Sequence, residues 1–323
     1  MACVCLMAMS YLTTNIGCFS IMQPILVALL PSYGTMVIRG DVMENYTVLI
    51  IDLIKSRSYK PDARASIQNY IVSVIRSLNA IFSGSLAKDV DFSAGDEIQG
   101  LFSSPQAAYL YLRMFCMLIF PVEIRAGIGI GEWNVRIENA STTAQDGPAY
   151  HNARYAMGNV KDALGCSVLF YSGEEADLYL NALVNASFTL TGKHSEYQNE
   201  LMLLAELLYP IDYHQAINRG KINQLLEIIA LKSETNYYKR SKSGKRRLLE
   251  KIEILNFKPV PIDAAKDEDV LFVSSGKKRG MNTQLAEILN ISRQSIEKTM
   301  KAANIYEIRN LTIAALKFMN NYL

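Results

Sequence analysis

An aspartate at the end of an uninterrupted apolar segment is the feature that most restricts how this chain can fold. Residues 46–52 read YTVLIID, which is typical of a short strand buried on both faces. Removing a carboxylate from water is unfavourable unless it is paired, hydrogen-bonded or bound to a metal ion. Asp52 therefore either caps the loop that follows, residues 53–58, or belongs to a site.

The segments after this strand predict an alternation of helices and strands. Apolar residues spaced by three and four predict a helix over residues 61–82, followed by two strands joined by a turn at 94–97, a helix over 105–120 and a glycine-rich strand over 122–131. This order favours the ferredoxin-like βαββαβ fold of the α+β class, an antiparallel sheet with helices on one face. A helix over 149–164 and a strand over 166–171 extend it.

Changes in composition divide the chain into five parts. Residues 1–44 are an apolar leader of uncertain role, 45–173 are the α+β domain, 174–256 a helical connector, 257–280 a linker rich in proline and charge, and 281–323 a small helical domain.

The leader has two interpretations. Its first basic residue, Arg39, follows the apolar stretch 21–30 instead of preceding it, which is unlike a signal peptide. It is either sequence upstream of a true start at Met43 or a membrane-associated tail. For the remainder we do not expect a membrane partner. The five cysteines form no CxxC pair, which favours a reducing compartment and hence a cytoplasmic location.

A second acid strengthens the case for a site at Asp52. Residues 95–97 read GDE and form the tip of the predicted hairpin, which a ferredoxin-like sheet places beside the first strand. Asp52 and Asp96 can then meet. Paired carboxylates are hard oxygen ligands that suit Mg²⁺ or Mn²⁺.

The C-terminal segment predicts a helix-turn-helix. A first helix with the small Ala286 at its crossing point is followed by a turn at Asn290 and by Ser292, which would cap a second helix. Residues at the start of such a second helix reach base edges in DNA, so we expect nucleic-acid contacts from four residues of it and a phosphate contact from Lys298. The four are Ser292, Arg293, Gln294 and Ser295. The alternative is a protein-contact module.

Four blocks carry a resemblance to a known family. They read IIDLIKS from residue 50, DFSAGDEIQGLF from 91, EIRAGIGIGEW from 123 and DGPAYHNARYA from 146. Together they resemble the SatD family, whose blocks are similar to the catalytic domain of class III nucleotidyl cyclases and, more distantly, to GGDEF domains. The resemblance implies a cyclase or palm-like domain over residues 46–171, followed by a helix-turn-helix.

This resemblance implies roles for further residues. Asp52 and Asp96 would bind metal and a nucleoside triphosphate, and the backbone after Asp52 would cradle the phosphates; these residues are Leu53, Ile54, Lys55 and Ser56. The sites of cyclases lie at a two-fold interface, which implies a homodimer.

The helix after the glycine-rich strand matches the cyclase pattern only in part. Arg154 matches the arginine that steadies phosphoryl charge, but Tyr150 stands where cyclases have an asparagine that orients the ribose, and the nearest asparagine is Asn152. His151 is a candidate general base, although a packing role is the alternative.

Three functions remain open. The chain is a nucleotidyl cyclase, a phosphorus–oxygen lyase, coupled to DNA binding, or a catalytically inactive nucleotide sensor and transcription regulator, or a scaffold in which the acids only satisfy a turn. The presence of both acids argues against the scaffold, and the missing asparagine favours sensing over turnover.

Overall fold

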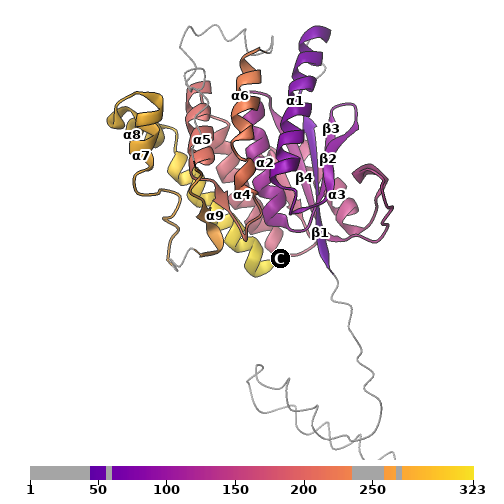
Figure 1. Ribbon diagram of the computed structural model, residues 1–323. Helices are drawn as coiled ribbons and strands as arrows, with labels where there is room; N and C mark the ends of the chain where they lie inside the picture. Colours follow the sequence, from indigo (N-terminus) through magenta and orange to yellow (C-terminus); the bar gives the residue numbers. More distant parts are fainter. Residues whose placement is uncertain (1–43, 56–59, 235–257, 267–270) are drawn as a thin grey trace, which may run out of the picture. The chain divides into compact units, whose positions relative to one another are not determined.

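The computed structural model describes residues 44–55, 60–234, 258–266 and 271–323 (Figure 1). Met43–Leu323 cluster into one compact unit. The leader up to residue 43, Ser56 and the basic run 239–247 lie outside the described residues, as does part of the predicted linker 257–280.

The unit is built on a five-stranded sheet with the order β2-β3-β1-β4-β5. The strands are β1 (Asn45–Leu53), β2 (Leu86–Ala94), β3 (Glu97–Phe102), β4 (Ile124–Glu132) and β5 (Val168–Tyr171). The first four follow the predicted ferredoxin-like order and are antiparallel. The added strand β5 pairs in parallel with β4, so the whole sheet is mixed. A helical crossover joins these two strands, and such a connection returns the chain in the same direction.

Two helices cover one face of the sheet. They are α1 (Pro61–Ile81) and α2 (Pro105–Ile119), and Leu49, Ile51 and Leu53 of β1 are buried in the same apolar cluster as their inner faces. The residues that α1 buries include the apolar ones whose spacing by three and four predicts the helix, which are Ile67, Tyr70, Ile71, Val74, Ile75 and Leu78. The N-terminus of α2 begins with Pro105 after Ser104, whose side chain accepts a hydrogen bond from the Ala107 amide.

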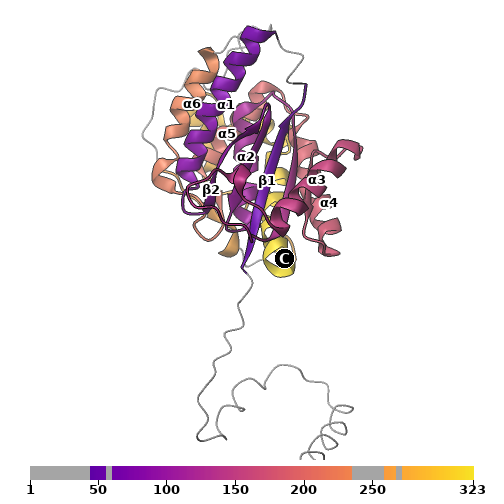
Figure 2. The ribbon, with the colours of Figure 1, turned by 90° about the vertical axis from the view of Figure 1, so that its right-hand side faces the viewer.

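A third helix, α3 (Pro148–Asp162), belongs to the extension after the ferredoxin-like part and lies on the opposite face of the sheet (Figure 2). Its buried side chains pack with Val48 and Ile50 of β1. A Cβ on Gly129 of β4 would lie 2.0 Å from the Ala153 amide nitrogen, and one on Gly127 would lie 2.5 Å from that of Met157. Only glycine lets the helix backbone come this close to the strand.

The remaining elements pack against the α1/α2 side and the β5 edge. They are α4 (Ala176–Thr191), α5 (Glu196–Leu208), the strand β6 (Ile211–Asp212) paired with β7 (Ile262–Asp263), α6 (Gln224–Glu234), α7 (Met281–Leu289), α8 (Arg293–Ala302) and α9 (Ile305–Tyr322), with short 3-10 turns at Thr142–Ala144, Arg219–Lys221 and Ala264–Lys266. Helix α9 packs along α4 (Figure 1).

A buried ion cluster holds α9 to the rest of the unit. The Glu206 carboxylate of α5 contacts Arg113 of α2 at 3.0 Å and Arg309 of α9 at 2.7 Å, and all three side chains are at most 5% exposed. Arg309 also donates to the carbonyls of Gly276 and Tyr209. A single carboxylate thus contacts arginines from two separate segments, which joins the C-terminal helices to the core of the sheet domain.

Candidate metal and nucleotide site

Three charged residues stand side by side across the sheet at the end of β1. Asp52 is directly opposite Glu97 of β3 and Arg125 of β4. Because side chains alternate along a strand, Asp52 points to the same face as Val48 and Ile50, which is the face that α3 covers. The row Glu97, Asp52, Arg125 therefore lies beneath α3.

The second predicted acid is close to the first. Asp96 lies in the β2–β3 turn beside Gly95, whose φ of +67° matches the positive φ expected at this position. Partial burial raises the pKa of the Asp52 carboxyl, and the negative charge of Asp96 raises it further. The structure therefore brings together the two acids that the sequence singled out, and the charge of Asp96 makes the ionised form of Asp52 less favourable.

Two carboxylates suit a metal site completed by a substrate's phosphates better than a site made only of protein ligands. In the described part of the chain no group of three or more His, Cys, Asp or Glu side chains is arranged to hold a metal ion. A site made only of protein ligands is therefore not supported here. Mg²⁺ is commonly held by one or two carboxylates together with the phosphate oxygens of a substrate, and the Asp52–Asp96 pair fits that second arrangement.

Three cations surround the acids. Arg125 of β4 and Lys161 in the last turn of α3 both act to lower the pKa of Asp52, but burial has the larger effect and raises it. Arg154, also on α3, contacts Glu97 at 3.7 Å between Nη1 and Oε1. Arg154 is predicted from the sequence, whereas Glu97, Arg125 and Lys161 are not. The register of β1 against β3 and β4 would have found the first two.

The predicted phosphate cradle is described only in part. Leu53 is the last residue of β1 and is buried, and the Ile54 amide donates to the Glu123 carbonyl at 2.9 Å. This hydrogen bond leaves the Ile54 amide no proton for a phosphate. Lys55 follows with a left-handed φ of 59° and an exposed side chain, and Ser56 lies outside the described residues.

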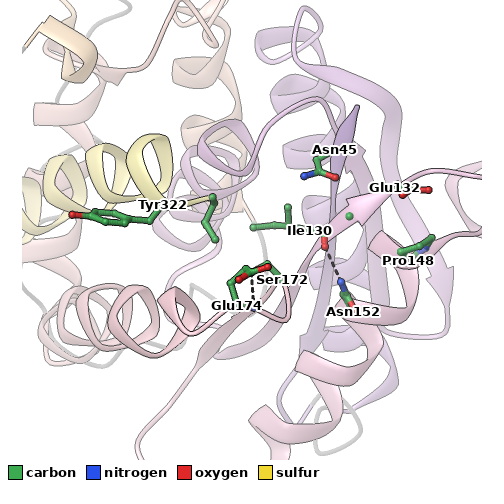
Figure 3. A pocket seen from close by; sticks show the side chains of 10 residues that line it. Asn45, Ile130, Glu132, Pro148, Asn152, Ser172, Glu174 and Tyr322 are labelled. Carbon is green, nitrogen blue, oxygen red and sulfur yellow. Dashed lines mark hydrogen bonds between the residues drawn. The ribbon is translucent and has the colours of Figure 1, made fainter. Parts of the chain in front are cut away.

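The first turns of α3 place the remaining candidates further along the helix. The His151 imidazole is paired with Asp146 at 3.5 Å and is largely exposed, so its described partner is not an acid of the strand–hairpin pair. Tyr150 is 6% exposed, and its hydroxyl lies 3.4 Å from that of Thr142. Tyr150 is thus a packing residue between α3 and the loop before it. The Asn152 amide donates to the Ile130 carbonyl at 2.7 Å (Figure 3).

Asn152 borders a polar cavity at the other end of β4. The cavity has a volume of about 420 Å³, and its lining includes Glu132, Pro148 and Glu174 (Figure 3). Among the described residues, its lining contains no lysine or arginine to offset phosphate charge. This cavity is therefore a poorer triphosphate site than the cation-flanked end of β1.

The C-terminal helices have the local geometry that the sequence predicts. Helix α7 ends at Asn290 in the left-handed conformation, and the Ser292 hydroxyl caps α8 by accepting from the Ser295 amide at 3.1 Å. Exposed side chains follow at Arg293, Gln294, Ser295 and Lys298. Their contact with DNA stays a prediction.

An acid on α8 engages two nearby lysines. Glu297 contacts Lys277 at 3.4 Å and Lys301 at 3.2 Å, and it accepts a short hydrogen bond from Asn282. Glu297 therefore offsets part of the positive charge of these two lysines. No helix within the described ranges is both long and apolar enough to cross a membrane.

Comparison with known proteins identifies the family to which this chain is similar. The profile of the SatD family matches residues 46–251. Among solved structures, the structure of a bacterial light-regulated adenylyl cyclase is similar at 13% identity over 39% of this chain and 74% of that chain, with a TM-score of 0.29, which is too low to support an argument about fold or activity. No curated protein matches the sequence.

Proposed function

We propose that this chain, which belongs to the SatD family, binds a metal–nucleoside triphosphate at Asp52 and Asp96. The observation that carries the proposal is the placement of Asp52 at the end of the central strand, opposite Glu97 and close enough to Asp96 to feel its charge. Two acids that disfavour each other's charge form an arrangement that a divalent cation relieves. We therefore take the cost of placing them together as a sign of a ligand.

The surrounding residues suit the phosphates of such a ligand. A bound Mg²⁺ or Mn²⁺ would neutralise part of the triphosphate charge and orient its oxygens. Arg125, Lys161 and Arg154 bring positive charge to the same face of the sheet. Arginine suits this role because its planar fork matches two phosphate oxygens at once. Lys55 and Ser56 extend the proposed phosphate contacts.

Calorimetry tests this binding directly. The full chain is titrated with ATP, GTP, CTP and UTP in the presence of Mg²⁺ or Mn²⁺, and we expect heat from at least one nucleotide. Asp96→Ala should lose it. Asp91→Ala, which removes an exposed acid from the neighbouring strand β2, should retain it. If wild type and Asp96→Ala behave alike, the proposal is wrong.

Whether the nucleotide is turned over is a second question. Tyr150 occupies the position of the ribose-orienting asparagine of cyclases, and its buried hydroxyl is directed to Thr142. This observation favours a nucleotide sensor over a nucleotidyl cyclase. After incubation with each triphosphate and Mn²⁺, a sensor leaves the nucleotide intact, whereas a cyclase forms cyclic nucleotide and pyrophosphate.

The C-terminal helices support a second activity, DNA binding. The supporting observation is the capped start of α8 with Arg293 and Gln294 exposed. Arg293→Ala should weaken binding to a selected DNA site more than Lys298→Ala does, because base contacts specify sequence and phosphate contacts do not. Equal losses would indicate nonspecific charge alone.

Two further proposals concern assembly, which follows from the cyclase resemblance, and location, which follows from the lack of a CxxC pair among the cysteines. A homodimer is expected and is tested by sedimentation of the full chain with and without nucleotide. A cytoplasmic location is expected and is tested by cell fractionation.

A further inference from the structure

The strongest further feature is the contact between Arg154 and Glu97, which joins α3 to β3 directly beside Asp52. Arg154 Nη1 lies 3.7 Å from Glu97 Oε1, and the same oxygen accepts a hydrogen bond from the Ser93 hydroxyl at 2.8 Å. Glu97 is directly opposite Asp52 in the sheet. Arg154, which we propose contacts the triphosphate, is therefore paired in this structure with Glu97, an acid of the same site.

This ion pair can be exchanged easily. The Arg154 side chain is 62% exposed and that of Glu97 is 24% exposed. Ion pairs so accessible to water are weak, because solvent screens the attraction and long side chains lose freedom when they pair. Arg154 can thus leave Glu97 without opening the core.

A metal ion bound by Asp52 and Asp96 would weaken the ion pair between Glu97 and Arg154. The β2–β3 turn places Glu97 next to Asp96 in the chain, and the sheet places it opposite Asp52. A dication held by these two acids attracts the Glu97 carboxylate and repels the Arg154 guanidinium, since a bound cation is the largest local charge. A guanidinium released from Glu97 would be available to two oxygens of a bound triphosphate.

We propose that Arg154 is an exchangeable counter-charge: it neutralises Glu97 in the ligand-free protein and moves to the triphosphate when metal and nucleotide bind together. Glu97 is then a positioning residue that holds the arginine at the site, and the exchange couples metal binding to triphosphate binding. This inference rests on the proposed function and goes beyond it by assigning opposite effects of one side chain on two ligands.

The test measures the two ligands separately on the full chain. Binding of Mn²⁺ alone is followed by the electron paramagnetic resonance signal of the free ion, and binding of ATP, GTP, CTP or UTP with Mn²⁺ is followed by calorimetry. Arg154→Ala should bind Mn²⁺ alone more tightly than wild type, by up to about fivefold, because Glu97 loses its counter-charge. The same variant should bind the triphosphate about tenfold more weakly or worse.

Two further variants separate the exchange from a general charge effect. Arg76→Ala removes an exposed arginine from α1, on the opposite face of the sheet, and should change neither binding. Glu97→Gln should weaken Mn²⁺ binding alone, and adding Arg154→Ala to it should no longer tighten that binding.

The outcomes are distinct. Opposite changes in Arg154→Ala, cancelled for Mn²⁺ by Glu97→Gln, support the exchange. Changes of the same sign, or none, overturn it while leaving the metal–triphosphate proposal intact. If wild type binds neither Mn²⁺ nor a triphosphate, the exchange and the proposed function both fail.

Discussion

The close approach of α3 to β4 leads to a sharp prediction about Gly129. This glycine lies on the α3 face, and a Cβ added to it would meet three backbone atoms of the helix, at 2.0 Å from Ala153 N, 2.3 Å from Ala149 O and 2.6 Å from Asn152 C. Backbone atoms in a hydrogen-bonded helix cannot rotate away as a side chain can. Gly129→Ala must therefore push the whole helix from the sheet.

The expected size of the effect follows from these distances. Ordinary contact begins near 3.4 Å, so α3 must move by about 1.4 Å at its closest point. Overpacking a core typically costs about 1–3 kcal/mol, and we expect about 3 kcal/mol or more because the obstacle is backbone. The same displacement carries Arg154 and Lys161 away from the acids, so triphosphate affinity should also fall.

Urea unfolding followed by circular dichroism measures the change in stability. The matched control is Gly158→Ala on α3 itself, where an added Cβ meets nothing within 4 Å. That change should stabilise the helix by about 0.5–1 kcal/mol, because alanine is the better helix former. If Gly129→Ala unfolds at the urea concentration of wild type, or if the two variants shift together, the account of the helix–strand contact is wrong.

Three further predictions concern charged side chains. Glu206→Gln leaves two buried arginines without their carboxylate and should lower the free energy of unfolding in urea by about 3–5 kcal/mol at pH 7. Burial alone would raise the pKa of Glu206, but the arginines hold it below its usual value, so wild type should lose this advantage as pH falls through that lowered pKa. Asp52→Asn should abolish Mn²⁺ binding and raise the melting temperature of the metal-free protein at pH 7, because the raised pKa of Asp52 means that folding disfavours its ionised form. This gain in melting temperature should shrink as pH falls through the raised pKa. A variant that melts at a lower temperature than wild type would contradict the prediction. Glu297→Gln should release Lys277 and Lys301 and strengthen DNA binding measured by fluorescence anisotropy. The dependence of DNA affinity on salt concentration should steepen by the equivalent of about one to two phosphate contacts. An unchanged salt dependence would count against DNA contact by those lysines.

Local patterns explain which parts of the fold the sequence could predict. The spacing of Ile67, Ile71 and Val74 predicts the buried face of α1, and the glycine at position 95 predicts a turn with positive φ; both match the structure. Each depends on residues that are close in the chain, so no knowledge of distant contacts was needed.

Features that depend on distant pairing were missed. Glu97 and Arg125 flank Asp52 only because of the register of three strands. Arg309 resembles an exposed helix arginine in the sequence, yet it is fully buried because Glu206 lies opposite it in the fold. The face that α3 covers can be read from the sequence, since Gly127 and Gly129 occupy alternate positions of a strand and mark the face that a helix backbone approaches.

The most direct test of the central claim is an anomalous diffraction map of crystals grown with Mn²⁺ and a nucleoside triphosphate. We predict a manganese peak in contact with carboxylate oxygens of both Asp52 and Asp96, with the phosphates beside Arg154. A nucleotide bound elsewhere, or a manganese peak that touches neither acid, would contradict the account.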